Sequence, residues 1–295
     1  MQRTATSKGG KAIIKITKWY WLPLFFIIFF QNSCGNPSGS NPPVPAGTTW
    51  RMAVMGDSRN DQAILDETVS NVMSLRPLPQ AAVHLGDFIE DAGMEAVWPQ
   101  VLTSLEPLRK NMKFFPVAGN HDIKTAGTAV EYRKEMNLPG NVNYYRKDLH
   151  GIHLIFLDGT IPGQDNEIVG DQLAWLKTQL NDLASSTDFK LVFCHFIFLT
   201  PMAGTHTVLN NAAELRGLFQ AAGVQAVFSA HNHYYDHQRD GGIDYFTSGG
   251  AGAPFEVSGP EAFYHFLLLN FAPDRMVVQV IGLDGLVKAT VTVPR

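Results

Sequence analysis

The chain has 295 residues, of which 45% are hydrophobic and 17% charged, and its formal net charge is −4 at pH 7. This length and composition allow one large globular domain, and the lack of a long run of like charge argues against a nucleic-acid-binding surface. The two cysteines, Cys34 and Cys194, exclude a framework of several disulfides.

Residues 1–33 have the pattern of an export signal. A lysine-rich segment ending at Lys18 precedes the apolar stretch 19–30, which is shorter than the roughly 20 residues that a membrane-spanning helix needs. Cys34 follows directly, which resembles a bacterial lipoprotein signal with cleavage before that residue. Gln31 and Asn32 replace the usual residues of that signal, so ordinary cleavage and retention as an anchor stay open.

Residues 34–48 are predicted to form a lipid-attachment site and a flexible linker, because residues 35–47 consist largely of Gly, Pro, Ser and Asn. The folded domain is then expected at 49–295. A lipid on Cys34 would hold it at a membrane surface, so we expect an exported cell-envelope protein that faces the periplasm or the cell exterior. Either membrane fits this pattern.

Apolar runs that predict strands alternate with amphipathic segments that predict helices, and strands alone follow His233. The predicted strands are 51–55, 81–85, 114–118, 190–193, 225–228, 243–247, 263–271, 276–281 and 286–293, and the predicted helices are 61–75, 94–110, 128–138, 171–183 and 210–222. This order predicts an α/β protein, a four-layer αββα sandwich of two mixed sheets with helices on the outer faces.

Polar motifs follow five of the predicted strands. They are Gly56-Asp57, Gly86-Asp87, Gly119-Asn120-His121-Asp122, Cys194-His195 and Ala230-His231-Asn232-His233. Asp, Asn and His supply oxygen and nitrogen ligands that suit two divalent or trivalent cations side by side. A ligand at a strand end points into the crevice outside the carboxyl edge of a sheet. The two histidines of the last motif are two residues apart, so both face one side of a continuing strand.

The order of these motifs resembles that of the calcineurin-like metallophosphoesterases, which have the metallo-dependent phosphatase fold. Residues 143–158 and 171–176 are also similar to the purple-acid-phosphatase branch. The resemblance implies a set of metal ligands, with Asp57 and His233 on a first metal, Asn120, His195 and His231 on a second, and Asp87 bridging the two. The ligand set suits Fe, Zn and Mn alike.

The resemblance also implies that His121 contacts the phosphate and serves the leaving oxygen, supported by Asp122. Two cations about 3.5–4 Å apart would bind the phosphoryl oxygens and activate a water as hydroxide for in-line attack. The expected function is metal-dependent hydrolysis of a small phosphorylated substrate at the cell envelope. Monoester and diester substrates both fit, and the pattern does not indicate an oligomeric state.

Arg59 departs from the family pattern, which has a His two residues after the first Asp. A guanidinium cannot ligate a metal. We interpret Glu90, or Asp91 beside it, as restoring the lost ligand, whereas Arg59 would bind a substrate phosphate oxygen. The alternative function is an attenuated or mononuclear relative that acts as a phosphate-ligand-binding lipoprotein.

The other histidines carry weaker signals. His206 and His237 are candidates for lining the substrate pocket. His84 lies inside a predicted strand and Cys194 at the end of one, so both are interpreted as buried structural residues.

Overall fold

The computed structural model describes residues 41–295 except 165 and 202–207. These residues belong to one compact unit, Gly39–Arg295. The predicted signal peptide, Cys34 and His206 lie outside the described residues. Across the described ranges, no helix is both long and apolar enough to cross a membrane.

Two six-stranded sheets form the centre of the described part. The strands are β1 (Trp50–Met55), β2 (Ala81–His84), β3 (Lys113–Pro116), β4 (Tyr145–Leu149), β5 (Ile152–Phe156), β6 (Phe189–Phe193), β7 (Ala226–Ser229), β8 (Tyr235–Asp240), β9 (Ile243–Ser248), β10 (His265–Phe271), β11 (Arg275–Gly282) and β12 (Val287–Pro294). The helices are α1 (Gln62–Ser74), α2 (Trp98–Asn111), α3 (Ala126–Met136), α4 (Gly170–Asp182) and α5 (Ala212–Ala222), with a 3-10 turn at Glu95–Val97.

The first sheet has the order β12-β11-β10-β1-β2-β3 and the second the order β4-β5-β6-β7-β9-β8. Both sheets are mixed. Strands β1, β2 and β3 are parallel, and β10, β11 and β12 join them antiparallel. In the second sheet β5, β6, β7 and β9 are parallel, and β4 and β8 form antiparallel edges. The expected α/β architecture of two mixed sheets is therefore confirmed.

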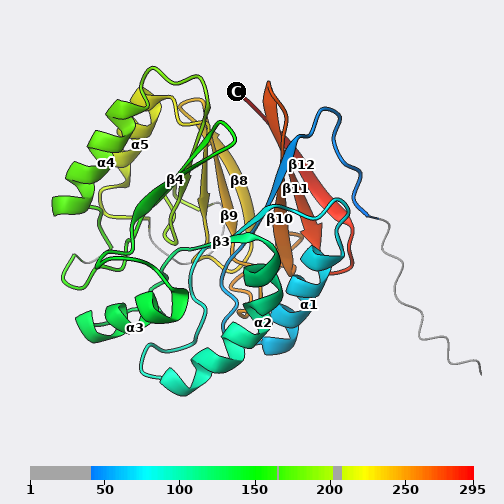
Figure 1. Cartoon of the computed structure of the whole chain (residues 1–295), viewed down its shortest axis with the longest axis vertical. Coiled ribbons are helices and arrows are strands. Elements are labelled where there is room, and N and C mark those ends of the chain that lie inside the picture. Colours follow the sequence, from blue (N-terminus) through cyan, green and yellow to red (C-terminus); the bar gives the residue numbers. More distant parts are fainter. Residues whose placement is uncertain (1–40, 165, 202–207) are drawn as a thin grey trace, which may run out of the picture. The chain divides into compact units, whose positions relative to one another are not determined.

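The alternation of side chains along each strand creates three apolar layers. In β1, Met52 and Val54 face the core between the two sheets, whereas Ala53 and Met55 face the helices. Helices α1, α2 and α3 pack on the outer face of the first sheet, and α4 and α5 pack on that of the second (Figure 1). The expected placement of helices on both outer faces is confirmed.

Helix ends follow local sequence signals. Asp61 caps α1, because its side chain accepts the backbone N–H groups of Ala63 and Ile64. Helix α5 ends at Gly223, which adopts the left-handed conformation with φ 67°. The cap at Asp61 fixes the point where the chain leaves the loop that carries Asp57 and Arg59.

The structure differs from the sequence prediction at three strands and at the linker. Strands β4, β5 and β8 were not predicted. The edge strands β4 and β8 each have a solvated face and carry few apolar residues, whereas the apolar inner strand β5 was not assigned to a strand. Residues 41–48, expected as part of a free linker, pack on the domain. The carbonyl groups of Pro43 and Ala46 accept hydrogen bonds from Gln279 and Arg275.

Candidate active site

Parallel strands bring the predicted motifs together at their carboxyl ends. Strands β1, β2 and β3 are neighbours and lead to Asp57, Asp87 and Asn120, whereas β6 and β7 lead to His195 and His231. Three of these residues have left-handed backbones, with φ 56° at Asp57, 56° at Asp87 and 68° at His231. Such conformations cost about 1–3 kcal/mol for a residue other than glycine and persist where the surroundings enforce them.

The second and third motifs touch through a glycine. A Cβ on Gly119 would lie 2.2 Å from both the backbone nitrogen and Oδ1 of Asp87. No side chain fits there, so glycine is what lets the loop of Asn120 approach the Asp87 carboxylate.

Asp122 holds the loops of the second and third motifs through their backbone groups. Its buried carboxylate accepts backbone N–H groups from Asp87 at 2.8 Å, Phe88 at 2.8 Å, Ile89 at 3.3 Å and Gly119 at 2.9 Å. Burial and the nearby Asp87 raise the pKa of this carboxyl, and the N–H donors oppose that rise. Asp122 therefore fixes the loop of Asp87 and the turn that leads from Gly119 to His121.

Three polar atoms of neighbouring residues converge on Nε2 of His195. Its Nε2 lies 3.0 Å from Asn120 Oδ1, 3.2 Å from His231 Nδ1 and 3.5 Å from Asp87 Oδ1. Its Nδ1–H donates to the Leu85 carbonyl at 2.9 Å, and burial lowers the pKa of the ring. Nε2 of this neutral ring therefore presents a lone pair to two oxygens, an arrangement that a metal cation between them stabilises.

Asp57 and His233 meet on the other side of Asp87, as expected for a first metal position. His233 Nε2 lies 3.6 Å from Asp57 Oδ1, a buried oxygen that has no hydrogen-bond partner among the described residues. Oxygens of Asp57 and Asp87 and a nitrogen of His195 also lie within 4.8 Å of one another. Burial, and next Asp87, raise the pKa of Asp57 well above its usual value, which is the electrostatic cost that a bound cation would relieve.

Arg59 extends into this first position. Its Nε lies 3.3 Å from Asp87 Oδ2, its Nη2 lies 3.3 Å from His233 Nε2, and its Nη1 forms an ion pair with Glu90. Glu90 therefore pairs with the guanidinium, and Asp91 pairs with Lys124 at 3.0 Å. The geometry gives neither carboxylate the predicted place beside His233.

His121 lies at the open side of the site, where its side chain is 25% exposed. Its backbone N–H donates to Asp87 Oδ1 at 2.9 Å, and its ring Nδ1–H donates to the Glu90 carbonyl. Nε2 then lies 3.9 Å from Asp87 Oδ2. The ring is thus held by Nδ1, and Nε2 is directed at the centre, where it can donate to a substrate oxygen when the ring is doubly protonated.

Two residues outside the predicted set, His84 and Glu256, hold the predicted ligands from behind. His84 Nδ1 accepts the N–H of Gly86 at 3.2 Å, so its Nε2–H donates to the Ser58 hydroxyl at 2.9 Å. The ring thereby joins the loops of Asp57 and Asp87. A histidine inside an apolar strand was the available signal, and it was interpreted as structural. Glu256, with Oε1 3.7 Å from His233 Nδ1, carried no sequence signal.

We expect the buried His84 ring to make the folded, metal-free protein less stable in acid. Burial lowers the pKa of His84 to about 3, so in acid the unfolded chain takes up a proton that the folded chain refuses. Stability should therefore fall as the pH drops below about 6.5, by about 2 kcal/mol at pH 5 for this group. Denaturant unfolding at pH 7 and pH 5 should show a smaller loss in His84→Asn. An equal loss in both proteins would contradict this assignment.

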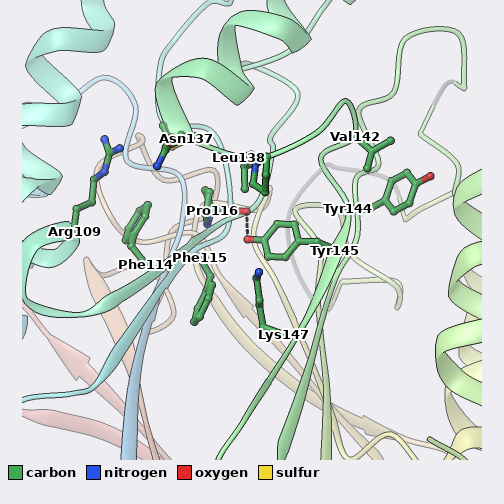
Figure 2. A pocket seen from close by; sticks show the side chains of 12 residues that line it. Arg109, Phe114, Phe115, Pro116, Asn137, Leu138, Val142, Tyr144, Tyr145 and Lys147 are labelled. Atoms are coloured by element: carbon green, nitrogen blue, oxygen red, sulfur yellow. Dashed lines mark hydrogen bonds between the residues drawn. The ribbon is translucent and has the colours of Figure 1, made fainter. Parts of the chain in front are cut away.

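His237 and a large cavity are two further prominent features of the described residues. His237, a candidate pocket residue, bonds to Asp244 at 2.9 Å and stacks on Phe246. A cavity of about 530 Å³ opens between β3, β4 and the end of α3. Figure 2 shows its aromatic lining, with the Tyr145 hydroxyl donating to the Pro116 carbonyl at 2.8 Å. No residue of the five motifs lines it, so it is not the candidate active site.

Comparison with known proteins identifies a family from the sequence and a similar fold among solved structures. The family model described as calcineurin-like phosphoesterase matches residues 51–235. Purple acid phosphatase 18 of Arabidopsis thaliana is 27% identical over 172 residues, covering 54% of this chain and 39% of that protein. A probable cyclic nucleotide phosphodiesterase of Rhodococcus erythropolis is 23% identical over 175 residues, covering 58% and 56%.

The chain thus spans about two fifths and just over half of the lengths of these two curated relatives. Among solved structures, purple acid phosphatase PPD1 from yellow lupin (Lupinus luteus) seeds superposes with a TM-score of 0.72 at 16% identity, covering 86% of this chain and 55% of that one. The family expected from the motifs is confirmed, because its model covers all five of them. This chain therefore belongs to the calcineurin-like phosphoesterase family.

Proposed function

We propose that this chain is a metal-dependent phosphoesterase that acts on small phosphorylated molecules at the cell envelope. The convergence of Asn120, His231 and Asp87 on one nitrogen of His195 carries the proposal. These donors fit a cation such as Fe, Zn or Mn, because they combine imidazole nitrogens with carboxylate and amide oxygens. When bound, the metal would supply Lewis-acid stabilisation of the phosphoryl oxygens and a nucleophile at neutral pH.

The side chains of this chain supply the remaining functions. The Arg59 guanidinium places a permanent positive charge beside Asp87, where it would bind a substrate phosphate oxygen. The His121 side chain is partly exposed next to the same carboxylate, and its doubly protonated ring would donate the Nε2 proton to the leaving oxygen. Asp122 holds the two loops in place through backbone N–H groups.

The location is a proposal from sequence, supported by the basic and apolar segments before Cys34. The lipid would act as the membrane partner, and the domain would meet substrates outside the cytoplasm. Mass spectrometry of the N-terminal peptide of the membrane-extracted protein would show the lipid on Cys34.

The second candidate function is a phosphate-ligand-binding lipoprotein with weak or no hydrolysis. The position of Arg59 favours it, because the guanidinium contacts His233 and Asp87 at the first metal position. Both candidates bind phosphate, and they differ in turnover.

One experiment separates the two candidates. The full chain is freed of metal by chelation, reloaded with Mn²⁺, Zn²⁺ or Fe²⁺, and assayed on phosphomonoesters and phosphodiesters of nucleotides, sugars and aryl alcohols. We expect hydrolysis that chelation abolishes and at least one metal restores. Absence of turnover with every metal and substrate, together with phosphate binding by calorimetry, would support the binding protein instead.

A further inference from the structure

We infer that the Arg59 guanidinium holds the first metal position, so that the protein binds a single metal ion, at Asp87, Asn120, His195 and His231. In place of a second metal, Arg59 would act as a fixed cation for the substrate phosphate. The phosphate role rests on the proposed function, whereas the metal count does not.

Arg59 faces the lone pair on His233 Nε2 that a metal would need. His233 Nδ1 lies 2.8 Å from the carbonyl oxygen of Pro254, so Nδ1 is the donor and Nε2 is the acceptor. Nη2 of Arg59 lies 3.3 Å from that Nε2. A metal on His233 would need the same lone pair at about 2.0–2.1 Å. An N–H donor and a metal cannot both use it.

The two oxygens of the Asp87 carboxylate face different cationic positions. Oδ2 lies 3.3 Å from Arg59 Nε, and Oδ1 lies 3.5 Å from His195 Nε2. A carboxylate that would bridge two metals is thus shared between a guanidinium on one side and the second metal position on the other.

The positive charge of Arg59 partly balances the buried carboxylates of Asp57 and Asp87. Asp57 and Asp87 are buried, with exposed fractions of 0% and 1%, and buried carboxylates need a positive charge nearby. A guanidinium stays charged at any working pH, so Arg59 supplies one such charge without a metal. Its ion pair with Glu90 holds the outer end of the side chain in this place.

The same side chain is accessible to substrate. The Arg59 side chain is 13% exposed, and its partner Glu90 is 45% exposed, so the pair lies at the mouth of the site. A phosphate oxygen would displace the Glu90 carboxylate from Nη1, and the planar guanidinium would bind the phosphate with two N–H groups. Arg59 is thereby assigned as a substrate-contacting residue.

Metal stoichiometry tests the inference independently of activity. The detergent-solubilised full chain, Arg59→His and a remote control, Arg216→His on the exposed side of α5, are saturated with Mn²⁺ and measured by elemental analysis. We expect one metal per chain in the wild type and the control, and two in Arg59→His. Electron paramagnetic resonance should show an isolated ion in the wild type and a coupled pair in the variant.

Two metals in the wild type would overturn the inference, and so would one metal in a folded Arg59→His. Arg59→Gln tests the phosphate role, because it keeps the metal at the second position and removes the charge. Inhibition by inorganic phosphate should weaken about tenfold or more, as for loss of a charge-assisted hydrogen bond. Unchanged inhibition would contradict that role. A single metal with no hydrolysis would contradict the proposed function alone.

Discussion

Replacing Asp87 by Asn is expected to remove the metal and to cause a large loss of activity. The carboxylate contacts both cationic positions, through Arg59 Nε at 3.3 Å and His195 Nε2 at 3.5 Å. Asn has the same shape, so its amide oxygen can still accept the backbone N–H of His121, now bonded at 2.9 Å. The substitution therefore removes charge more than structure.

The expected size follows from weaker interactions of the same kind. Loss of a residue that only orients a metal ligand costs about 10–100-fold in metal affinity, so loss of the shared ligand should cost at least about 100-fold. Loss of one group that stabilises transition-state charge costs about 10²–10³ in kcat, and Asp87→Asn should exceed that range. Asp148→Asn, in an exposed ion pair with Arg146, is the matched control and should keep both properties.

Elemental analysis and steady-state kinetics on the same preparations measure both effects, and thermal unfolding shows that the variant is folded. Retention of wild-type metal content by Asp87→Asn would remove this carboxylate from the metal centre. A full metal complement with lost activity would give it a role in positioning Arg59 alone.

Most of the site could be predicted from the sequence, because the predicted ligands lie directly after strand ends. Asp57, Asp87 and Asn120 each follow a parallel strand of the first sheet, and parallel neighbours necessarily open at the same edge. The sequence does not show the left-handed backbones of Asp57 and Asp87, because only tertiary contacts enforce them on a residue with a side chain.

The direction of the Arg59 side chain could not be predicted from the sequence either. Two interpretations were open for this residue, a phosphate contact and the cause of a lost metal site. Its contacts with Glu90 and His233 come from segments 31 and 174 residues away, so its direction depends on the completed fold. The contacts of Asp122 were not predictable for the same reason, because its partners are backbone groups that carry no sequence signature.

Strands β4 and β8 show where pattern reasoning fails in the fold. Both lie at edges of the second sheet, and β8 has the sequence Tyr-Asp-His-Gln-Arg-Asp with exposed residues at its end. A strand with one neighbour and a solvated face is defined by its backbone pairing, which hydropathy does not report.

Replacing His121 by Asn is expected to lower kcat according to how poor the leaving group is. Nδ1–H of the ring donates to the Glu90 carbonyl, and an Asn side-chain amide can replace that donor. Asn has no counterpart of Nε2, which lies 3.9 Å from Asp87 Oδ2 and is accessible to substrate. The variant therefore keeps the loop anchored and loses the group that would protonate the leaving oxygen.

For an alkyl phosphoester, whose alkoxide leaves poorly, the loss of a positioned acid should reduce kcat by about 10²–10⁴. For a nitrophenyl phosphoester the reduction should be far smaller, because nitrophenolate leaves without a proton. Metal content should stay at the wild-type value, since Asn120, His195 and His231 are unchanged. Equal losses on both substrates would instead assign His121 to phosphate binding, because a contact to the phosphoryl group acts on every substrate alike.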